Sequence, residues 1–376
     1  MDQLTSMASD DAPPAIVCGT TFGQVYLAAL ASPGAPFRLA GILSRGSSRS
    51  ASYARRYGVP HFTDLNQIPD DVAAACVVIR SGLLGGNGTM IAQQLMARGI
   101  HVVQEHPVHH DELAACLRQS RASHAVYQLN SFYVHLAPVR RFIGAARELL
   151  SRHRPVFADA ICGFQVGYAL FDILGQALGG LRPWEFSALP ARGNAGGPFR
   201  SVAGVLAGVP LTLRIQNELD PADPDNYAHL FHRVTIGTEA GQLTLVGTHG
   251  PVVWSARPRL PMRADRPGGT SPLDSTDLPS SVVLGPTEVP GWPEIFRTVW
   301  PAGAGQALRC LRDAISASDD SLRRGQYHLA LCLLWQDLAA CLGPPDLVSR
   351  AEPTVLSVSD LAALVAAAEG AGGRGE

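Results

Sequence analysis

The chain has 376 residues, of which 46% are hydrophobic and only 16% are charged, and its formal net charge is −2 at pH 7. This length exceeds the size at which one hydrophobic core usually keeps growing, so we expect two domains, and the apolar composition excludes a disordered protein. A net charge so close to zero gives no reason to expect nucleic acid or an anionic membrane as a partner.

Several features of the sequence predict a cytoplasmic protein. Two aspartates precede Pro13-Pro14, and no basic segment followed by an apolar one is present, so we expect no signal peptide. No apolar stretch reaches the length of a membrane span without interruption. The seven cysteines are odd in number and lack Cys-x-x-Cys spacing, which is typical of reduced thiols, and no metal site is predicted.

The first third of the chain alternates strand-like and helix-like segments. The predicted strands are Ala15–Cys18, Phe37–Leu43, Ala74–Ile79, Ile100–Gln104 and Ala125–Leu129, and the predicted helices run from the first glycine turn to Ala31 and over Ser50–Tyr57, Gly88–Arg98 and His110–Ser120. Alternation with short connections indicates βαβ units in a parallel sheet covered on both faces. We therefore predict an α/β protein with an N-terminal Rossmann domain over residues 1–135.

The pattern changes after a helix expected at Ala137–Ser151. Alternating apolar and polar runs follow at about 155–164, 184–189, 200–206, 210–218, 230–237 and 242–248. They predict a C-terminal α+β domain over residues 136–376, with a largely antiparallel, open-faced sheet. We expect a long surface loop over Arg257–Pro290, amphipathic helices at Gln306–Ser316 and Gln326–Leu342, and a disordered Gly/Ala/Arg tail.

The first strand runs directly into a glycine-containing turn, Cys18-Gly19-Thr20-Thr21-Phe22-Gly23-Gln24. The dinucleotide fingerprint is Gly-x-Gly-x-x-Gly, and only its first glycine is in register here. In context, the turn closes a strand and opens a helix whose free N–H groups suit a pyrophosphate, and Gly23 can still permit close backbone approach. A glycine turn in a domain that binds no nucleotide is the alternative.

Basic and hydroxyl side chains follow the second strand. NAD-specific enzymes usually place a carboxylate there, but this chain has Ser44-Arg45-Gly46-Ser47-Ser48-Arg49. Two guanidiniums and three hydroxyls suit a ribose 2′-phosphate, which arginine grips with charge-assisted hydrogen bonds. The segment therefore favours NADPH, and a solvated basic loop is the alternative.

The predicted strand Ile100–Gln104 ends in Gln104-Glu105-His106-Pro107, at the edge of the sheet where ligands of open α/β sheets bind. This segment resembles the Glu-Lys-Pro motif of the glucose–fructose oxidoreductase (Gfo/Idh/MocA) family, with His106 in place of the acid/base lysine. The chain contains no lysine at all. A histidine, whose ordinary pKa is about 6.5, can donate a proton near neutral pH. The alternative is a helix-capping or core histidine.

The predicted strand Ala125–Leu129 leads into a crossover segment that carries Tyr133. In the same family this crossover faces the substrate. The Tyr133 hydroxyl can donate a hydrogen bond or relay a proton, and the alternative is a packed aromatic between the domains.

Three stretches together resemble the thiazolinyl imide (imine) reductases of yersiniabactin- and pyochelin-type siderophore biosynthesis. They are Cys-Gly-Thr-Thr-Phe-Gly-Gln-Val-Tyr-Leu (18–27), Glu-His-Pro-Val-His (105–109) and Tyr133. The resemblance implies reduction by NADPH of a thiazoline C=N bond to a thiazolidine, on a thioester carried by a nonribosomal peptide synthetase carrier domain. It proposes His106 and Tyr133 as proton donors.

The resemblance also assigns positions around the cofactor. It implies that Phe22 lies in the pyrophosphate turn, that Ser81 lies near the ribose or nicotinamide, and that Glu105 belongs to the cofactor site. Since family members often pair through an exposed sheet face, it implies a homodimer.

Two other functions stay open. One is a sugar or inositol dehydrogenase of the same family, against which stand the missing lysine and the absence of a histidine near Asp172, where sugar-acting relatives often keep a His/Asp pair. The other is a non-catalytic NADP-binding regulator or synthetase-docking subunit, which the incomplete glycine fingerprint favours.

Overall fold

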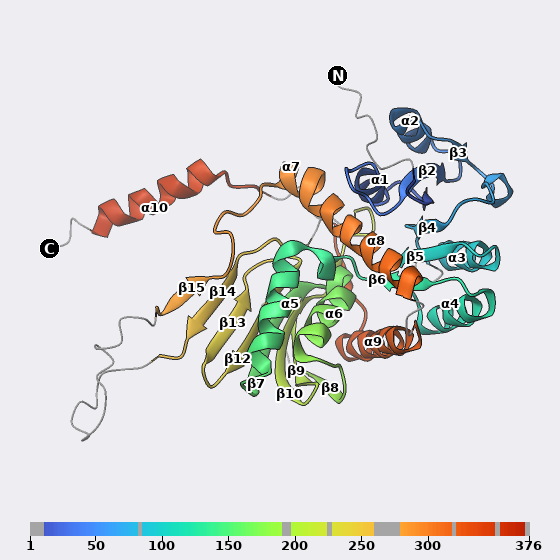
Figure 1. Ribbon diagram of the computed structural model, residues 1–376. Helices are drawn as coiled ribbons and strands as arrows, with labels where there is room; N and C mark the ends of the chain where they lie inside the picture. Colours follow the sequence, from blue (N-terminus) through green and yellow to red (C-terminus); the bar gives the residue numbers. More distant parts are fainter. Residues whose placement is uncertain are drawn as a thin grey trace.

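The computed structural model describes residues 11–81, 85–189, 197–223, 228–258, 279–317, 321–349 and 354–372 (Figure 1). The N-terminal domain contains a six-stranded parallel sheet of order β3-β2-β1-β4-β5-β6. The strands are β1 (Pro14–Cys18), β2 (Arg38–Leu43), β3 (His61–Phe62), β4 (Ala74–Val77), β5 (His101–Glu105) and β6 (Tyr127–Asn130). This order, which reverses direction between β1 and β4, confirms the predicted Rossmann arrangement.

Helices α1 (Gln24–Leu30), α2 (Ser48–Tyr57), α3 (Gly88–Ala97) and α4 (His110–Ser123) connect these strands. The residues of β4 are buried throughout, because helices cover both faces of the sheet, and this explains its uninterrupted apolar sequence. The carboxyl ends of β1, β2, β5 and β6 lie at one edge of the sheet, which brings the glycine turn and the His106 segment to the same side of the domain.

The C-terminal domain contains an eight-stranded sheet of order β15-β14-β13-β12-β7-β10-β9-β8. Its strands are β7 (Pro155–Gly163), β8 (Trp184–Ala188), β9 (Phe199–Leu206), β10 (Val209–Gln216), β12 (His232–Thr238), β13 (Gly241–Leu245), β14 (Val252–Ala256) and β15 (Ser281–Val283). All neighbours pair antiparallel except β7 and β10. Helices α5 (Ala137–Leu150) and α6 (Gly167–Leu178) cover one face (Figure 1), which confirms the predicted mixed sheet domain.

Helices near the C-terminal end of the chain pack against both domains. A short helix α7 (Trp292–Glu294), a π-helical turn η6 (Ile295–Val299) and α8 (Trp300–Ala317) are continuous, and α8 packs against α1 of the first domain. Helix α9 (Ser321–Leu342) packs against both α4 and α6. A two-stranded sheet of β11 (Glu218–Leu219) and β16 (Asp346–Leu347) ties the end of α9 back to the second domain. Among the described residues, no helix is both long and apolar enough to cross a bilayer.

Three expectations about elements need correction. Helix α6 was not predicted, because nearly all its residues are buried and its sequence lacks the polar face that marks an amphipathic helix. The expected disordered Gly/Ala/Arg tail is helical as far as Gly372, in helix α10 (Val358–Gly372), whose alanines are strong helix formers, while residues 373–376 lie outside the described part of the chain. The expected loop at 257–290 contains β15, while its residues 259–278 lie outside the described part of the chain.

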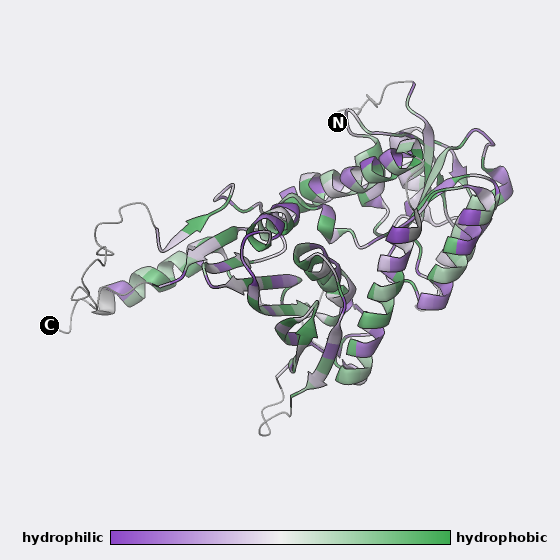
Figure 2. Cartoon of the chain, turned by 60° about the horizontal axis from the view of Figure 1, so that its bottom comes forward, coloured by the Kyte–Doolittle hydropathy of each residue, from purple (hydrophilic) through white to green (hydrophobic). Residues whose placement is uncertain are grey.

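Helix α10 carries apolar side chains that are exposed along its length. Val358, Leu361, Leu364 and Val365 are each more than half exposed. Figure 2 shows α10 projecting away from both domains, with apolar residues on much of its surface.

Candidate active site and nucleotide site

The glycine turn between β1 and α1 packs closely on itself. Gly19 has a φ of +88°, and a side chain there would meet the carbonyl oxygen of Val78. A Cβ on Gly23 would lie 2.0 Å from the carbonyl oxygen of Gly19. Both glycines are therefore required by the backbone of the turn itself, which explains why a glycine stands at position 23 although the fingerprint places it elsewhere.

The hydroxyl groups predicted to contact the cofactor fall into two sets. The buried Thr20 hydroxyl bonds the Ser50 hydroxyl at 2.8 Å, and Ser47 caps α2 by accepting from the Ser50 amide. Ser44 bonds His61 Nε2 at 2.8 Å. The Thr20–Ser50 bond thus holds the turn against α2, and the Ser44 bond holds the end of β2 against β3. Thr21, in contrast, is exposed.

Two arginines lie at the carboxyl end of β2, beside the glycine turn. Arg49 donates to the Thr21 hydroxyl at 2.6 Å and thereby spans the ends of β1 and β2. Arg45 is exposed in the same segment. An exposed hydroxyl and two guanidiniums beside a tight glycine turn are donors that suit the phosphates of a dinucleotide, so the residues present fit this cofactor.

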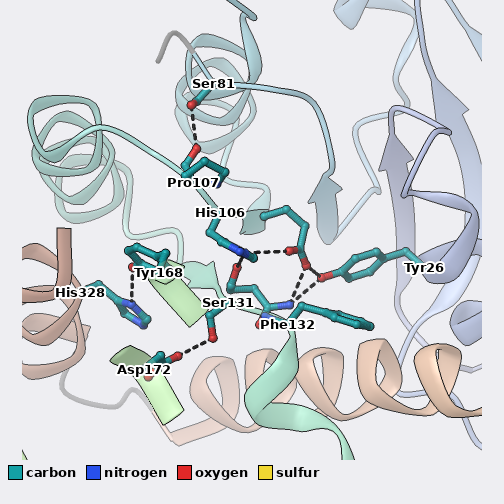
Figure 3. Close-up of polar contacts among 11 residues, drawn as sticks. Tyr26, Ser81, His106, Pro107, Ser131, Phe132, Tyr168, Asp172 and His328 are labelled. Carbon is teal, nitrogen blue, oxygen red and sulfur yellow. Dashed lines mark hydrogen bonds and ion pairs between the residues drawn. The ribbon is translucent and has the colours of Figure 1, made fainter. Parts of the chain in front are cut away.

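His106 lies where β5 ends and is nearly buried, with a side-chain exposure of 11%. Its Nδ1 lies 3.1 Å from the carbonyl oxygen of Asn130 and 3.5 Å from a carboxylate oxygen of Glu105 (Figure 3). Because a carbonyl oxygen only accepts hydrogen bonds, Nδ1 carries the hydrogen, and a proton exchanged by the ring enters or leaves at Nε2.

The Glu105 carboxylate is fixed by two neighbours that sequence reasoning did not single out. Tyr26 donates its hydroxyl hydrogen to one carboxylate oxygen, and the Asn130 amide donates to the same oxygen at 2.8 Å. Burial, followed by the nearby Glu105 charge, raises the pKa of Tyr26 well above its usual value, so Tyr26 stays a neutral donor. The Glu105 carboxyl group is thus held in one orientation beside His106.

A second group of aromatic and imidazole side chains faces His106 from α6 and α9. The ring of Tyr168 stacks on the His106 ring, with centroids 5.4 Å apart, and its hydroxyl lies 3.1 Å from His328 Nδ1. Burial raises the pKa of Tyr168 and lowers that of His328, so both are neutral near pH 7. Residues 106, 168 and 328 are far apart in sequence, and no local pattern indicates that they meet.

The chain turns sharply where β6 ends. Phe132 has a φ of +62°, and the Tyr133 amide donates to the Ser131 carbonyl across it at 2.7 Å, which makes a strained γ-turn. The Asn130 side chain accepts from the Phe132 amide at 3.0 Å and supports this turn. The turn aims the Phe132 ring at Phe22 of the glycine turn, at 4.9 Å.

Tyr133 lies in a one-turn helix η3 (Tyr133–His135) next to the second sheet. Its ring contacts Phe231 and His232, the latter edge to face at 4.8 Å. Burial lowers the pKa of His232 to about 3, so this histidine is neutral.

The remaining predicted residues lie beside the same segment. Ser81 donates to the carbonyl oxygen of Pro107 at 2.7 Å and so holds the residue after His106 (Figure 3). Asp172 is buried and accepts from Ser131, from Gln176 at 2.9 Å and from Tyr327 at 2.9 Å.

The expectation that no histidine lies near Asp172 is wrong. Helix α6 packs against both η3, which carries His135, and α9, which carries His328. Burial lowers the pKa of both histidines, and the nearby Asp172 charge opposes this shift in each. The argument drawn from a missing His/Asp pair therefore does not exclude a sugar substrate.

Comparison with known proteins assigns families to both parts of the chain. Residues 15–131 match the oxidoreductase family with an NAD-binding Rossmann fold (Gfo/Idh/MocA). Residues 153–255 match the family described as thiazolinyl imine reductase Irp3-like, C-terminal. No curated protein sequence matches the chain.

Solved structures with a similar fold include several oxidoreductases. An oxidoreductase from Agrobacterium radiobacter, in complex with NAD+, L-tartaric acid and magnesium, is 10% identical, with 88% of this chain and 96% of that chain covered and a TM-score of 0.64. Levoglucosan dehydrogenase, in complex with NADH and levoglucosan, is 13% identical, with 88% and 97% covered and a TM-score of 0.63. A dehydrogenase from Chromobacterium violaceum is 14% identical, with 97% and 99% covered and a TM-score of 0.60.

At these identities the solved structures show the fold alone, and the two family matches carry the classification. The two matches thus indicate an oxidoreductase of Gfo/Idh/MocA type, with an NAD(P)-binding Rossmann domain followed by a C-terminal domain that is similar to that of the thiazolinyl imine reductases.

Proposed function

We propose that the protein reduces the C=N bond of a thiazoline ring to a thiazolidine during nonribosomal siderophore biosynthesis, on a thioester held by a peptide synthetase carrier domain. The observation that carries the proposal is an imidazole, His106, at the acid/base position of a lysine-free chain whose second domain matches thiazolinyl imine reductases. NADPH, when bound, supplies the hydride that the ring carbon accepts.

His106 supplies the proton that the ring nitrogen needs. Because Nδ1–H is held by the Asn130 carbonyl, Nε2 is the atom that gives its proton to the substrate nitrogen. Glu105, 3.5 Å from Nδ1, balances the positive charge of the ring before transfer. His106 is left neutral after transfer and takes a new proton from solvent. Tyr133 is the competing donor.

The preference for NADPH rests on the charges at the end of β2. Arg45 and Arg49 offer guanidiniums to a 2′-phosphate, and this segment of the chain has no carboxylate to hold the ribose hydroxyls of NADH.

A second candidate is oxidation of a sugar or polyol, which the grouping of His328 and His135 around Asp172 favours. Against it, the Asp172 carboxylate already accepts hydrogen bonds from Ser131, Gln176 and Tyr327. These contacts give it a clear role inside the protein, where it joins the segment after β6 to α6 and α9.

The test of the mechanism is a pair of substitutions assayed with NADPH and a hydroxyphenyl-thiazoline thioester. We expect His106→Gln to lower kcat by about 10² to 10⁴-fold, with little change in NADPH affinity measured by fluorescence titration. Tyr133→Phe is the matched comparison, and we expect a smaller loss. If Tyr133→Phe abolishes turnover while His106→Gln retains it, the proton comes from Tyr133.

A further inference from the structure

The segment over residues 354–372 exposes more large apolar side chains than any other part of the chain that the structure describes. Six valines and leucines in it are each between 51% and 86% exposed. They are Val355, Leu356, Val358, Leu361, Leu364 and Val365. Helix α10 makes up most of the segment and projects away from both domains (Figure 2). We call residues 354–372 the C-terminal arm.

The arm forms its helix by local interactions. Where α10 begins, the Ser357 hydroxyl accepts from the Asp360 amide at 3.1 Å, and the Asp360 carboxylate accepts from the Ser357 amide at 3.2 Å. Every residue from 354 to 369 is exposed, so this part of the arm is not buried by its own chain. Because a helix of this length is only marginally stable in water without packing, its apolar side chains need a second surface.

The apolar side chains of α10 gather along the helix. Val358, Leu361 and Val365 are three or four residues apart, so they lie on one side, where they line a shallow open groove. The only charged residues of α10 are Asp360 and Glu369. The arm therefore presents an apolar stripe accompanied by two carboxylates and no cation.

The area of the arm indicates what covers it. Six side chains that are on average about two-thirds exposed offer on the order of 400 Å² of apolar surface. A single arm docked on a different protein then buries about 800 Å², counting both sides, which is the size of a weak packing contact. Two arms exchanged between two copies related by a twofold axis bury about 1,600 Å², which is the size of a specific interface. The area therefore favours a second copy of this chain.

The charges indicate where on the second copy the arm lies. Two α10 helices side by side would bring only carboxylates together. On the open face of the eight-stranded sheet, Arg214 of β10 and Arg233 of β12 lie opposite Ile161 of β7, one on each side, and both arginines are exposed. Together with Asp159, they leave these three central strands with a net positive charge. An apolar side chain between two cations complements an apolar stripe that carries two carboxylates.

We propose that the C-terminal arm of each copy packs on the open sheet face of a second copy, with its apolar stripe over the central strands β7, β10 and β12. The arm is then an interaction surface for self-association. This inference goes beyond the proposed reaction and depends neither on the substrate nor on the cofactor.

The first test places charges in the stripe of the full-length chain. We expect Leu361→Asp combined with Leu364→Asp to raise the dissociation constant of the dimer about 100-fold, because two unpaired carboxylates would be buried. Sedimentation equilibrium measures this constant, and unchanged NADPH affinity shows that the variant is folded. Leu347→Asp, at an exposed apolar residue of β16 outside the arm, is the matched control and should dimerise like the wild type.

The second test addresses the receiving surface. We expect Arg214→Glu combined with Arg233→Glu to weaken the dimer about tenfold or more, since like charges then face the arm. Arg55→Glu, at an exposed arginine of α2, is the control for a charge reversal elsewhere. If the arm variant weakens the dimer and the double arginine variant does not, the arm lies elsewhere on the partner and the assignment to the sheet face is overturned.

Equal dissociation constants for the wild type and the arm variant would overturn the proposal, as would a wild type that is monomeric at every concentration tested. A monomeric wild type that binds a synthetase carrier domain, with binding lost in the arm variant, would make the arm a docking helix for the synthetase and would overturn the proposal as well.

Discussion

His106 shows how a single substitution in a common framework changes the chemistry available to a site. A lysine ammonium is a point charge on a flexible stem, whereas an imidazole has two distinct nitrogens and one plane. Here the plane is set by the stacked Tyr168 ring and the tautomer is set by the Asn130 carbonyl. The environment therefore orients one nitrogen toward the protein and leaves Nε2 for chemistry.

At the nucleotide site, we propose that Arg45 decides the choice between NADPH and NADH. We expect Arg45→Ala to raise the KM for NADPH by about tenfold or more, because a charge-assisted hydrogen bond to phosphate is lost, and to leave the KM for NADH nearly unchanged. Arg55, exposed on α2 and distant from the turn in sequence, is the control with equal loss of charge. Equal effects of Arg45→Ala on both cofactors would remove Arg45 from the phosphate site.

His232 makes stability depend on pH. Its Nε2–H donates to the Val166 carbonyl and its Nδ1 accepts from the Thr248 hydroxyl, so the folded protein keeps it neutral, with a pKa lowered to about 3 by burial. The unfolded chain takes up this proton near the ordinary histidine pKa of about 6.5, so stability is complete above that pH and is lost as the pH falls toward 3.

We therefore expect the free energy of unfolding to fall, on account of His232, by about 1.4 kcal/mol per pH unit below pH 6. The measurement is urea unfolding at several pH values in the wild type and in His232→Asn. In the variant, the slope of the unfolding free energy against pH should be smaller by the contribution of one proton, about 1.4 kcal/mol per pH unit. An unchanged slope would show that His232 is not the group responsible.

Among the elements, the glycine turn is the one that tolerates side-chain substitution least. A Cβ on Gly23 would lie 2.0 Å from the Gly19 carbonyl oxygen, so Gly23→Ala must push α1 away from β1. We expect it to abolish measurable NADPH binding in a fluorescence titration and to lower the Tm by several degrees. Gly144→Ala on α5, where an added Cβ meets nothing within 4 Å, should bind normally and gain slightly in stability. Normal binding by Gly23→Ala would contradict the tight turn.

Elements with a clear period or flanking signals were predictable from sequence. Strand β4 is uniformly apolar, and the helix at Gly88–Ala97 ends before Gly99, so both were located to within two residues. Helix α6 was missed because burial on all sides removes the amphipathic signal, and its core residues look the same whether they form a helix or a strand.

The same reasoning explains which residues of the candidate site could be predicted from the sequence. His106 follows a buried strand, and the rule that ligands bind beyond the carboxyl ends of parallel strands pointed to it. The same rule could have found Asn130, which ends the neighbouring strand β6. Tyr168 and His328 come from α6 and α9 and reach His106 only through tertiary packing, for which a single sequence holds no signal.

For the whole molecule, the exposed face of the eight-stranded sheet is the main feature without a partner in the described chain. Helices α5 and α6 cover the other face (Figure 1), while Thr212, Arg214 and Arg233 of β10 and β12 are exposed. We propose that two copies pair through this open face.

Light scattering should then give a mass about twice the 39.8 kDa of one chain. Thr235→Arg, in the middle strand β12, should give the monomer mass, because burying an unpaired charge in the interface is costly. Thr63→Arg, at an exposed residue of the first domain, is the control. A dimer that survives Thr235→Arg would place the interface elsewhere.

The central claim is that this oxidoreductase acts on a cyclic C=N bond and uses NADPH. The most direct measurement follows NADPH oxidation by the purified protein with a hydroxyphenyl-thiazoline thioester, and NAD(P)+ reduction with a panel of sugars and inositol. We predict NADPH consumption that depends on the thioester, a thiazolidine product by mass spectrometry, and no turnover of the panel. Turnover of a sugar or inositol, with none of the thioester, would contradict the claim.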